Sequence, residues 1–71
     1  MDKKSFSFVV YIIHACANKW GTLPSDVYDK LKSTGCIRDF LVSYYDVLHT
    51  QGTDYIVGNV KDYLTTRGVT I

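Results

Sequence analysis

The chain has 71 residues, a formal net charge of +1 and 46% hydrophobic residues. A chain of this length forms one domain, and such a domain buries only about 60% of the surface that its unfolded chain exposes. The eight lysines and arginines are scattered and mostly interleaved with acids, whereas nucleic-acid binders cluster their cations. We therefore predict a single helical domain over residues 1–71 and expect no nucleic-acid partner.

Cysteine content and hydropathy indicate a cytoplasmic protein. Cys16 and Cys36 are the only cysteines, fewer than a secreted disulfide scaffold usually carries. No cleavage site of a signal peptide ends the apolar run that follows Lys4. The most apolar stretch, Phe8 to Ile13, is far shorter than the roughly 20 residues that span a bilayer. We expect reduced, buried thiols and no membrane segment.

The first predicted helix runs from about Phe6 to Trp20. Its inward stripe repeats at helical spacing and comprises Phe6, Val9/Val10, Ile13, Cys16/Ala17 and Trp20. Further apolar residues, Phe8, Tyr11, Ile12 and Ala15, cover other faces, and a helix that is apolar on most sides is usually central. Gly21 is expected to end it, since glycine adopts the left-handed conformation without steric cost.

The second predicted helix follows Pro24, with Ser25 as its N-cap and Asp26 in its first turn. Its expected inward residues are Val27/Tyr28, Leu31 and Thr34, and Gly35 is expected to end it.

The third predicted helix spans about Ile37 to Leu48 and ends before Gly52. Its expected stripe is Ile37, Phe40/Leu41, Tyr44 and Leu48. The fourth starts at Thr53 or Asp54, ends near Arg67-Gly68 and points Ile56, Val60 and Tyr63/Leu64 inward. Gly58 costs roughly 1 kcal/mol relative to alanine inside a helix, and would permit close approach of another helix or a partner. The predicted fold is all-α: a compact four-helix domain with an apolar central first helix.

Four residues without apolar character, His49 to Gly52, join the third and fourth helices. In the structural interpretation, Thr50 and Gln51 satisfy the last carbonyls of the third helix, and His49 favours its negative end. In the functional interpretation this is a recognition loop on a rigid scaffold, flanked by aromatic anchors. The two interpretations are compatible. The candidate partner-binding residues are Tyr45, His49, Thr50, Gln51 and Tyr55.

No pattern predicts a metal site, a cofactor or an enzyme. His14 and Cys16 would point about 200° apart on a helix, so they cannot share a metal ion. A small enzyme using Cys36 and His49 is a remote alternative, because only a nearby helix start would activate the thiol. A helix-turn-helix DNA-binding regulator over Ser25–Leu48 is a second alternative, although its acidic residues Asp39 and Asp46 would repel phosphates.

The aromatic content favours a protein–protein interaction module. Six Tyr, three Phe and one Trp cannot all fit inside the core of so short a chain, so some tyrosines must lie on the surface. Clusters of exposed aromatics are typical of interfaces. We therefore predict a cytoplasmic module that covers a protein partner, and a homodimer is also compatible with the sequence.

One segment resembles a known family. Tyr45-Asp46-Val47-Leu48-His49-Thr50-Gln51-Gly52, followed by Tyr55-Ile56-Val57 and Asp62-Tyr63-Leu64, is similar to small bacterial proteins classified only as a domain of unknown function, with Leu-His-Thr-Gln-Gly as the hallmark. The resemblance covers nearly the whole chain, and departs at Gly58-Asn59, where acidic residues are expected before Val60. Such proteins are often encoded beside a larger protein resembling an ADP-ribosyltransferase-type toxin. The resemblance implies an antitoxin or accessory partner and assigns no functional residue.

Overall fold

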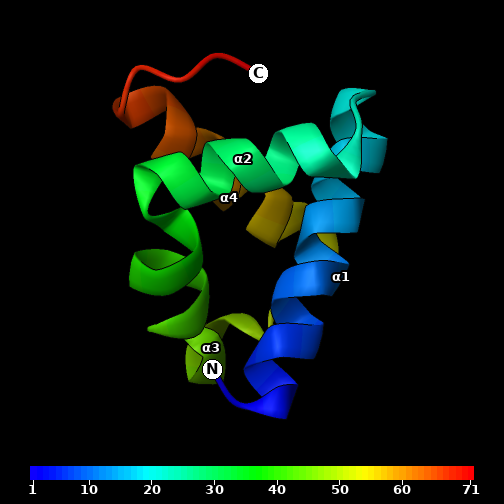
Figure 1. The fold of residues 1–71 in the computed structure, drawn as a ribbon. Coiled ribbons are helices and arrows are strands. Elements are labelled where there is room, and N and C mark those ends of the chain that lie inside the picture. Colours follow the sequence, from blue (N-terminus) through cyan, green and yellow to red (C-terminus); the bar gives the residue numbers. More distant parts are fainter.

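The computed structural model describes residues 1–71 and is all-helical, as predicted. It has five elements rather than four, in the order α1 (Lys3–Trp20), α2 (Pro24–Thr34), the π-helix η1 (Ile37–Val42), α3 (Tyr45–Leu48) and α4 (Thr53–Thr66). Figure 1 shows α2 lying across the upper ends of α1 and η1, with the two chain termini at opposite ends of the molecule. No helix combines the length and the hydropathy that a membrane crossing requires.

The fourteen buried apolar residues form one core cluster, to which α1 and α4 contribute most. α1 contacts three of the other four elements, α2, η1 and α4. Its buried stripe is Ser5, Val9, Ile12, Ile13, Cys16 and Ala17. The predicted inward position of Phe6 is wrong: Ser5 occupies the first turn of the stripe, which leaves Phe6, Val10 and Tyr11 exposed.

The starts of α1 and α2 differ from the predicted ones. α1 begins at Lys3, because the Asp2 carboxylate caps it by accepting a hydrogen bond from the Ser5 amide at 2.8 Å. α2 begins at Pro24, and the extended Leu23 is its N-cap in place of Ser25. Proline suits the first helical position, since its missing N–H would have no partner inside the helix anyway.

Three predicted helix ends are confirmed, at Gly21, at Gly35 and at Arg67, the C-cap of α4, and one is wrong. Gly21 and Gly35 are left-handed, with φ of 65° and 78°, and their amides donate to carbonyls of the helices that they end. Gly52 has an extended backbone, with φ of −70°, and is the N-cap of α4. Thr53 and Asp54 therefore lie inside α4, and the Thr53 hydroxyl instead hydrogen bonds with the Tyr11 hydroxyl at 2.7 Å. No other helix approaches Gly58, because a Cβ built there would meet nothing within 4 Å.

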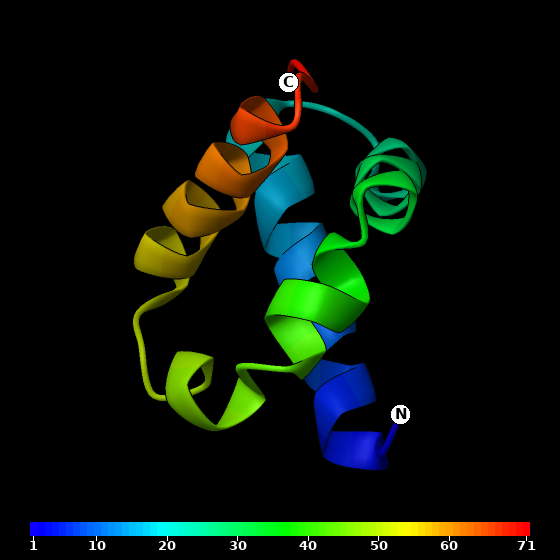
Figure 2. The ribbon, with the colours of Figure 1, turned by 90° about the vertical axis from the view of Figure 1, so that its left-hand side faces the viewer.

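The predicted third helix is broken into η1 and α3. The Ser43 amide donates to the Arg38 carbonyl, five residues back, and the Ser43 hydroxyl donates to the same carbonyl at 2.8 Å. Tyr44 then leaves the helical region, with φ of −108° and ψ of 21°, and α3 begins at the next residue. Figure 2 shows that η1 and α4 run in opposite directions and that α3 lies at the turn between them.

Candidate functional site

The segment from His49 to Gln51 does cap the preceding helix. The Thr50 hydroxyl donates to the Val47 carbonyl at 2.7 Å, and the Gln51 amide donates to the Leu48 carbonyl at 2.9 Å. His49 Nδ1 donates to the Tyr45 carbonyl at 2.8 Å. The structural interpretation of this segment is therefore confirmed: its polar groups satisfy the last carbonyls of α3.

The five candidate partner-binding residues do not form one site. The Tyr45 ring stacks on the His49 ring, with centroids 4.7 Å apart, and meets the Phe8 ring of α1 edge-on at 5.3 Å. This side of Tyr45 borders a shallow depression next to Lys3 and Lys4. Gln51 and Tyr55 line a different surface, between α3 and α4, and Thr50 acts as the cap described above.

That second surface is a groove of about 420 Å³, which we call the aromatic groove. One wall comes from η1, α3 and the following loop: Phe40, Tyr44, Val47, Leu48 and Gln51. The opposite wall comes from α4: Tyr55, Asn59, Asp62, Tyr63 and Thr66. Four residues of the α4 wall are spaced i, i+4, i+7 and i+11, a helical stripe beside the buried one, and this periodicity was the available sequence signal for it.

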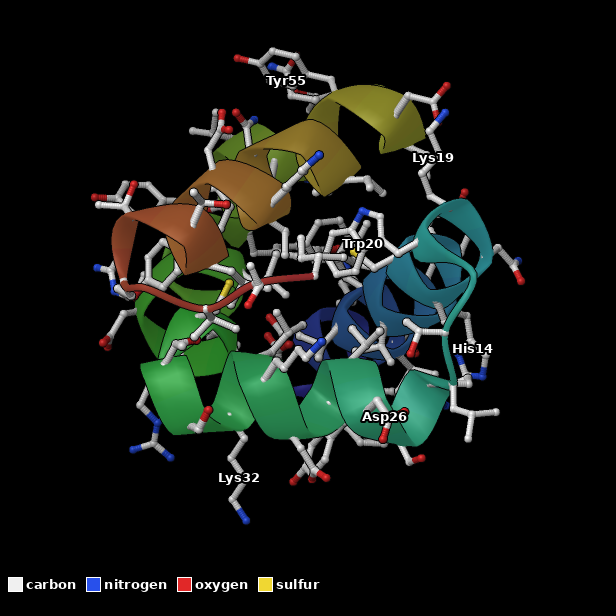
Figure 3. All side chains as sticks on the ribbon, turned by 90° about the horizontal axis from the view of Figure 1, so that it is seen from above. His14, Lys19, Trp20, Asp26, Lys32 and Tyr55 are labelled. Carbon is white, nitrogen blue, oxygen red and sulfur yellow. The ribbon has the colours of Figure 1, made fainter.

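Within the aromatic groove, the Phe40 ring packs against both Tyr63 and Tyr44, and its centroid lies 6.1 Å from that of the Tyr44 ring. The Tyr63 ring stacks on Phe40 with centroids 5.7 Å apart, and the Arg67 guanidinium lies 3.5 Å from the Tyr63 ring centroid. Tyr44 and Tyr55 are 56% and 61% exposed. Figure 3 shows the Tyr55 side chain at the edge of the molecule, pointing away from the helices.

The largest groove, of about 770 Å³, lies between α1, α2 and η1, and we call it the apolar groove. α1 contributes mostly apolar residues to it: Met1 just before the helix, then Phe6, Val9, Val10 and Ile13. α2 and its C-terminal end contribute Tyr28, Lys32 and Gly35, and η1 contributes Ile37, Arg38, Asp39 and Val42. Sequence reasoning missed this groove because it placed both Phe6 and Tyr28 among the inward residues.

The rim of the apolar groove carries cations. The Lys32 amine lies 5.8 Å from the centroid of the Tyr28 ring, and Figure 3 shows this lysine extending away from the body of the molecule. Arg38 lines the same groove from η1. Asp39 lines the groove as well, so an occupant would meet apolar surface beside two cations and one carboxylate, a net charge of +1 (+2 − 1).

The two thiols are in a setting unlike that of reactive cysteines. Cys16 and Cys36 are completely buried and are not joined in a disulfide. Burial raises the pKa of each thiol to about 12, so both are protonated at neutral pH. No group of three or more His, Cys, Asp or Glu side chains is arranged to hold a metal ion.

Of the comparisons with known proteins, only the comparison with family models found a match. No curated protein and no solved structure matches it. A family model described as "Protein of unknown function (DUF3791)" matches residues 7–67, which include every helix except the first turn of α1. The chain therefore belongs to the DUF3791 family.

Proposed function

We propose that this chain is a protein-interaction module whose apolar groove receives an amphipathic helix of a larger protein. The observation that carries the proposal is the exposure of large side chains in that groove: Phe6 is 58%, Tyr28 43% and Val10 36% exposed. Fully burying one such apolar side chain contributes roughly 1.5–3 kcal/mol. A partner that covered the groove would therefore gain binding energy from surface that this chain leaves in water.

The groove favours a helix with a defined pattern. On α1 the lining residues Phe6, Val10 and Ile13 repeat at helical spacing over two turns, about 10 Å of helix. A partner helix that presents apolar residues at i, i+3 or i+4 and i+7 matches that length. The charged lining residues Lys32, Arg38 and Asp39 together carry a net charge of +1 (+2 − 1), which favours an acidic residue beside the apolar ones.

The sequence resemblance suggests who that partner is. Similar bacterial proteins are often encoded beside a protein resembling an ADP-ribosyltransferase-type toxin, so we extend the proposal to an antitoxin or accessory role in the cytoplasm. Tyr45, His49, Thr50, Gln51 and Tyr55 stay candidate contacts, on two separate surfaces. A second copy of this chain is the competing occupant of the apolar groove.

The two other functions have less support. A recognition helix over the range 37–48 would need to be continuous, whereas the chain there forms a six-residue π-helix and one turn of α3. An enzyme using Cys36 and His49 would need an activated thiol, whereas burial raises the pKa of Cys36.

The test is an affinity purification of the tagged chain from its native host, with mass spectrometry of the co-eluting proteins. It compares the wild type with Phe6→Asp, which places a charge in the apolar groove. The matched control is Leu23→Asp, because Leu23 is 64% exposed and lies outside both grooves. Circular dichroism checks that both variants keep the helical fold.

We expect one near-stoichiometric protein with the wild type and with Leu23→Asp, and its loss with Phe6→Asp. Recovery of the chain alone, or only with further copies of itself, would refute the antitoxin and partner proposal. If Phe6→Asp captures as much of the partner as the wild type does, the partner does not bind in the apolar groove.

A further inference from the structure

The aromatic groove has a chemistry of its own, distinct from that of the apolar groove. Asp62 is its only charged lining residue, and it lies on the same stripe of α4 as Tyr55 and Asn59. The other lining residues are aromatic, aliphatic or neutral polar. The groove therefore combines ring faces with a single negative charge.

Both of these features select a cation. The face of an aromatic ring attracts a positive charge within about 6 Å of its centroid. A carboxylate attracts the same charge and repels an anion, and an uncharged apolar group would remove water from Asp62 without replacing its hydrogen bonds. The two selections are independent, since one depends on the rings and the other on the formal charge.

One ring of the aromatic groove already makes such a contact. The Arg67 guanidinium lies over the Tyr63 ring at 3.5 Å, and its Nη1 donates to the Tyr63 carbonyl at 3.3 Å. Because Phe40 stacks on Tyr63 as well, these rings have little face left to offer. The Tyr44 ring also contacts Phe40, with centroids 6.1 Å apart, but Tyr44 stays 56% exposed and Tyr55 61% exposed, so these two residues offer ring surface towards the α3 end of the groove.

The layout of the groove fits a long side chain with a cationic head. Tyr55 and Asp62 are seven residues apart on α4, about 10 Å along the helix axis. Arginine has an apolar stem that packs on rings and a planar head that stacks on aromatics and pairs with a carboxylate through two hydrogen bonds. Lysine has the stem and the charge but lacks the planar head.

We propose that the aromatic groove binds an arginine side chain of a protein partner, through the exposed rings of Tyr44 and Tyr55 and the carboxylate of Asp62. The inference rests on the proposed function only for the source of the arginine. The recognition itself is a property of the groove and is tested with a peptide, so it fails or succeeds independently of whether a partner is captured.

The experiment is an NMR titration of the isotope-labelled chain with the blocked tripeptide acetyl-Gly-Arg-Gly-amide at low ionic strength. The control ligands are the same peptide with citrulline, which has nearly the shape of arginine without the charge, and with lysine. Asp62→Asn removes the charge and keeps the side-chain shape. The matched control variant is Asp54→Asn, because Asp54 is also exposed on α4 but lies outside the groove.

We expect saturable shifts of the Gln51, Tyr55, Asn59 and Asp62 amide signals with the arginine peptide. The affinity should fall about tenfold for the citrulline peptide and for Asp62→Asn, the size expected when a charge-assisted hydrogen bond is lost. Asp54→Asn should bind like the wild type. Shifts that do not saturate, equal affinity for citrulline or lysine, or an unchanged affinity in Asp62→Asn would each overturn the assignment.

Discussion

Replacing Leu41 by alanine should be among the most damaging single changes to this fold. Leu41 is completely buried, and it is the only buried side chain of η1. Removing a buried leucine side chain costs about 2–5 kcal/mol, through lost burial and the cavity left behind. At about 0.05–0.15 kcal/mol per residue, a chain of 71 residues has a free energy of unfolding of roughly 4–11 kcal/mol. The substitution should therefore remove between about a fifth and all of the stability.

Urea denaturation followed by circular dichroism measures this loss directly. The midpoint should fall while the slope of unfolding free energy against urea stays the same, because the surface exposed on unfolding hardly changes. Val47→Ala is the matched control: Val47 lies on the neighbouring α3 and is exposed, so its loss should stay within about 0.5 kcal/mol. In thermal unfolding each kcal/mol should lower the midpoint by about 4–8 °C.

A loss below about 1 kcal/mol in Leu41→Ala, or one no larger than that of Val47→Ala, would refute the reasoning. It would mean that η1 is not held against the core through Leu41. The common wall of both grooves would then lack its main anchor.

Two further predictions concern glycines and thiols. Gly35→Ala should lower the free energy of unfolding by about 1–2 kcal/mol, because Gly35 is left-handed and a Cβ there would lie 2.9 Å from Asp39 Oδ2. Gly58→Ala should raise it by roughly 0.5–1 kcal/mol, because Gly58 is in a helix and a Cβ there meets nothing. Urea unfolding should therefore shift the midpoints of the two variants in opposite directions, and shifts in the same direction would contradict the prediction. Stability should also fall at alkaline pH, because burial raises the pKa of Cys16 and Cys36 from 9.0 to about 12 and the unfolded chain loses these protons first. Below pH 9.0 this contribution is fully present, and between pH 9.0 and about 12 it should decline by up to roughly 1.4 kcal/mol per pH unit for each thiol. Urea unfolding across this range should show the decline, a Cys36→Ala variant should show a shallower one, and identical slopes in both proteins would exclude the thiols as its cause.

Local signals in the sequence predicted most of the helices correctly. Gly21 and Gly35 end α1 and α2 because a left-handed residue is needed there, and that requirement is visible without tertiary structure. The break between η1 and α3 was not predictable in the same way. Over six residues, the apolar spacing of a π-helix can hardly be told from that of an α-helix, so Ile37 to Leu48 read as one helix. Phe6 was misplaced because Ser5, a small polar residue, takes the buried position.

The candidate surfaces were predictable only in part. Gln51 and Tyr55 do line a groove, and Asp62 lines it too. Asp62 lies there because α4 folds back beside η1, and helical periodicity in the sequence does not predict such a tertiary contact. The cap formed by Thr50 needs only neighbouring residues, and it was predicted. The apolar groove was missed altogether, since its residues come from three elements, and several of them would equally suit a core.

The two grooves share a wall. η1 presents Ile37 and Val42 to the apolar groove and Phe40 to the aromatic groove, and it lies between them. A ligand that moves this one short element while binding on one side must change the shape offered on the other. Thermodynamic linkage then requires reciprocity: the factor by which the first ligand alters the affinity for the second equals the factor by which the second alters the affinity for the first.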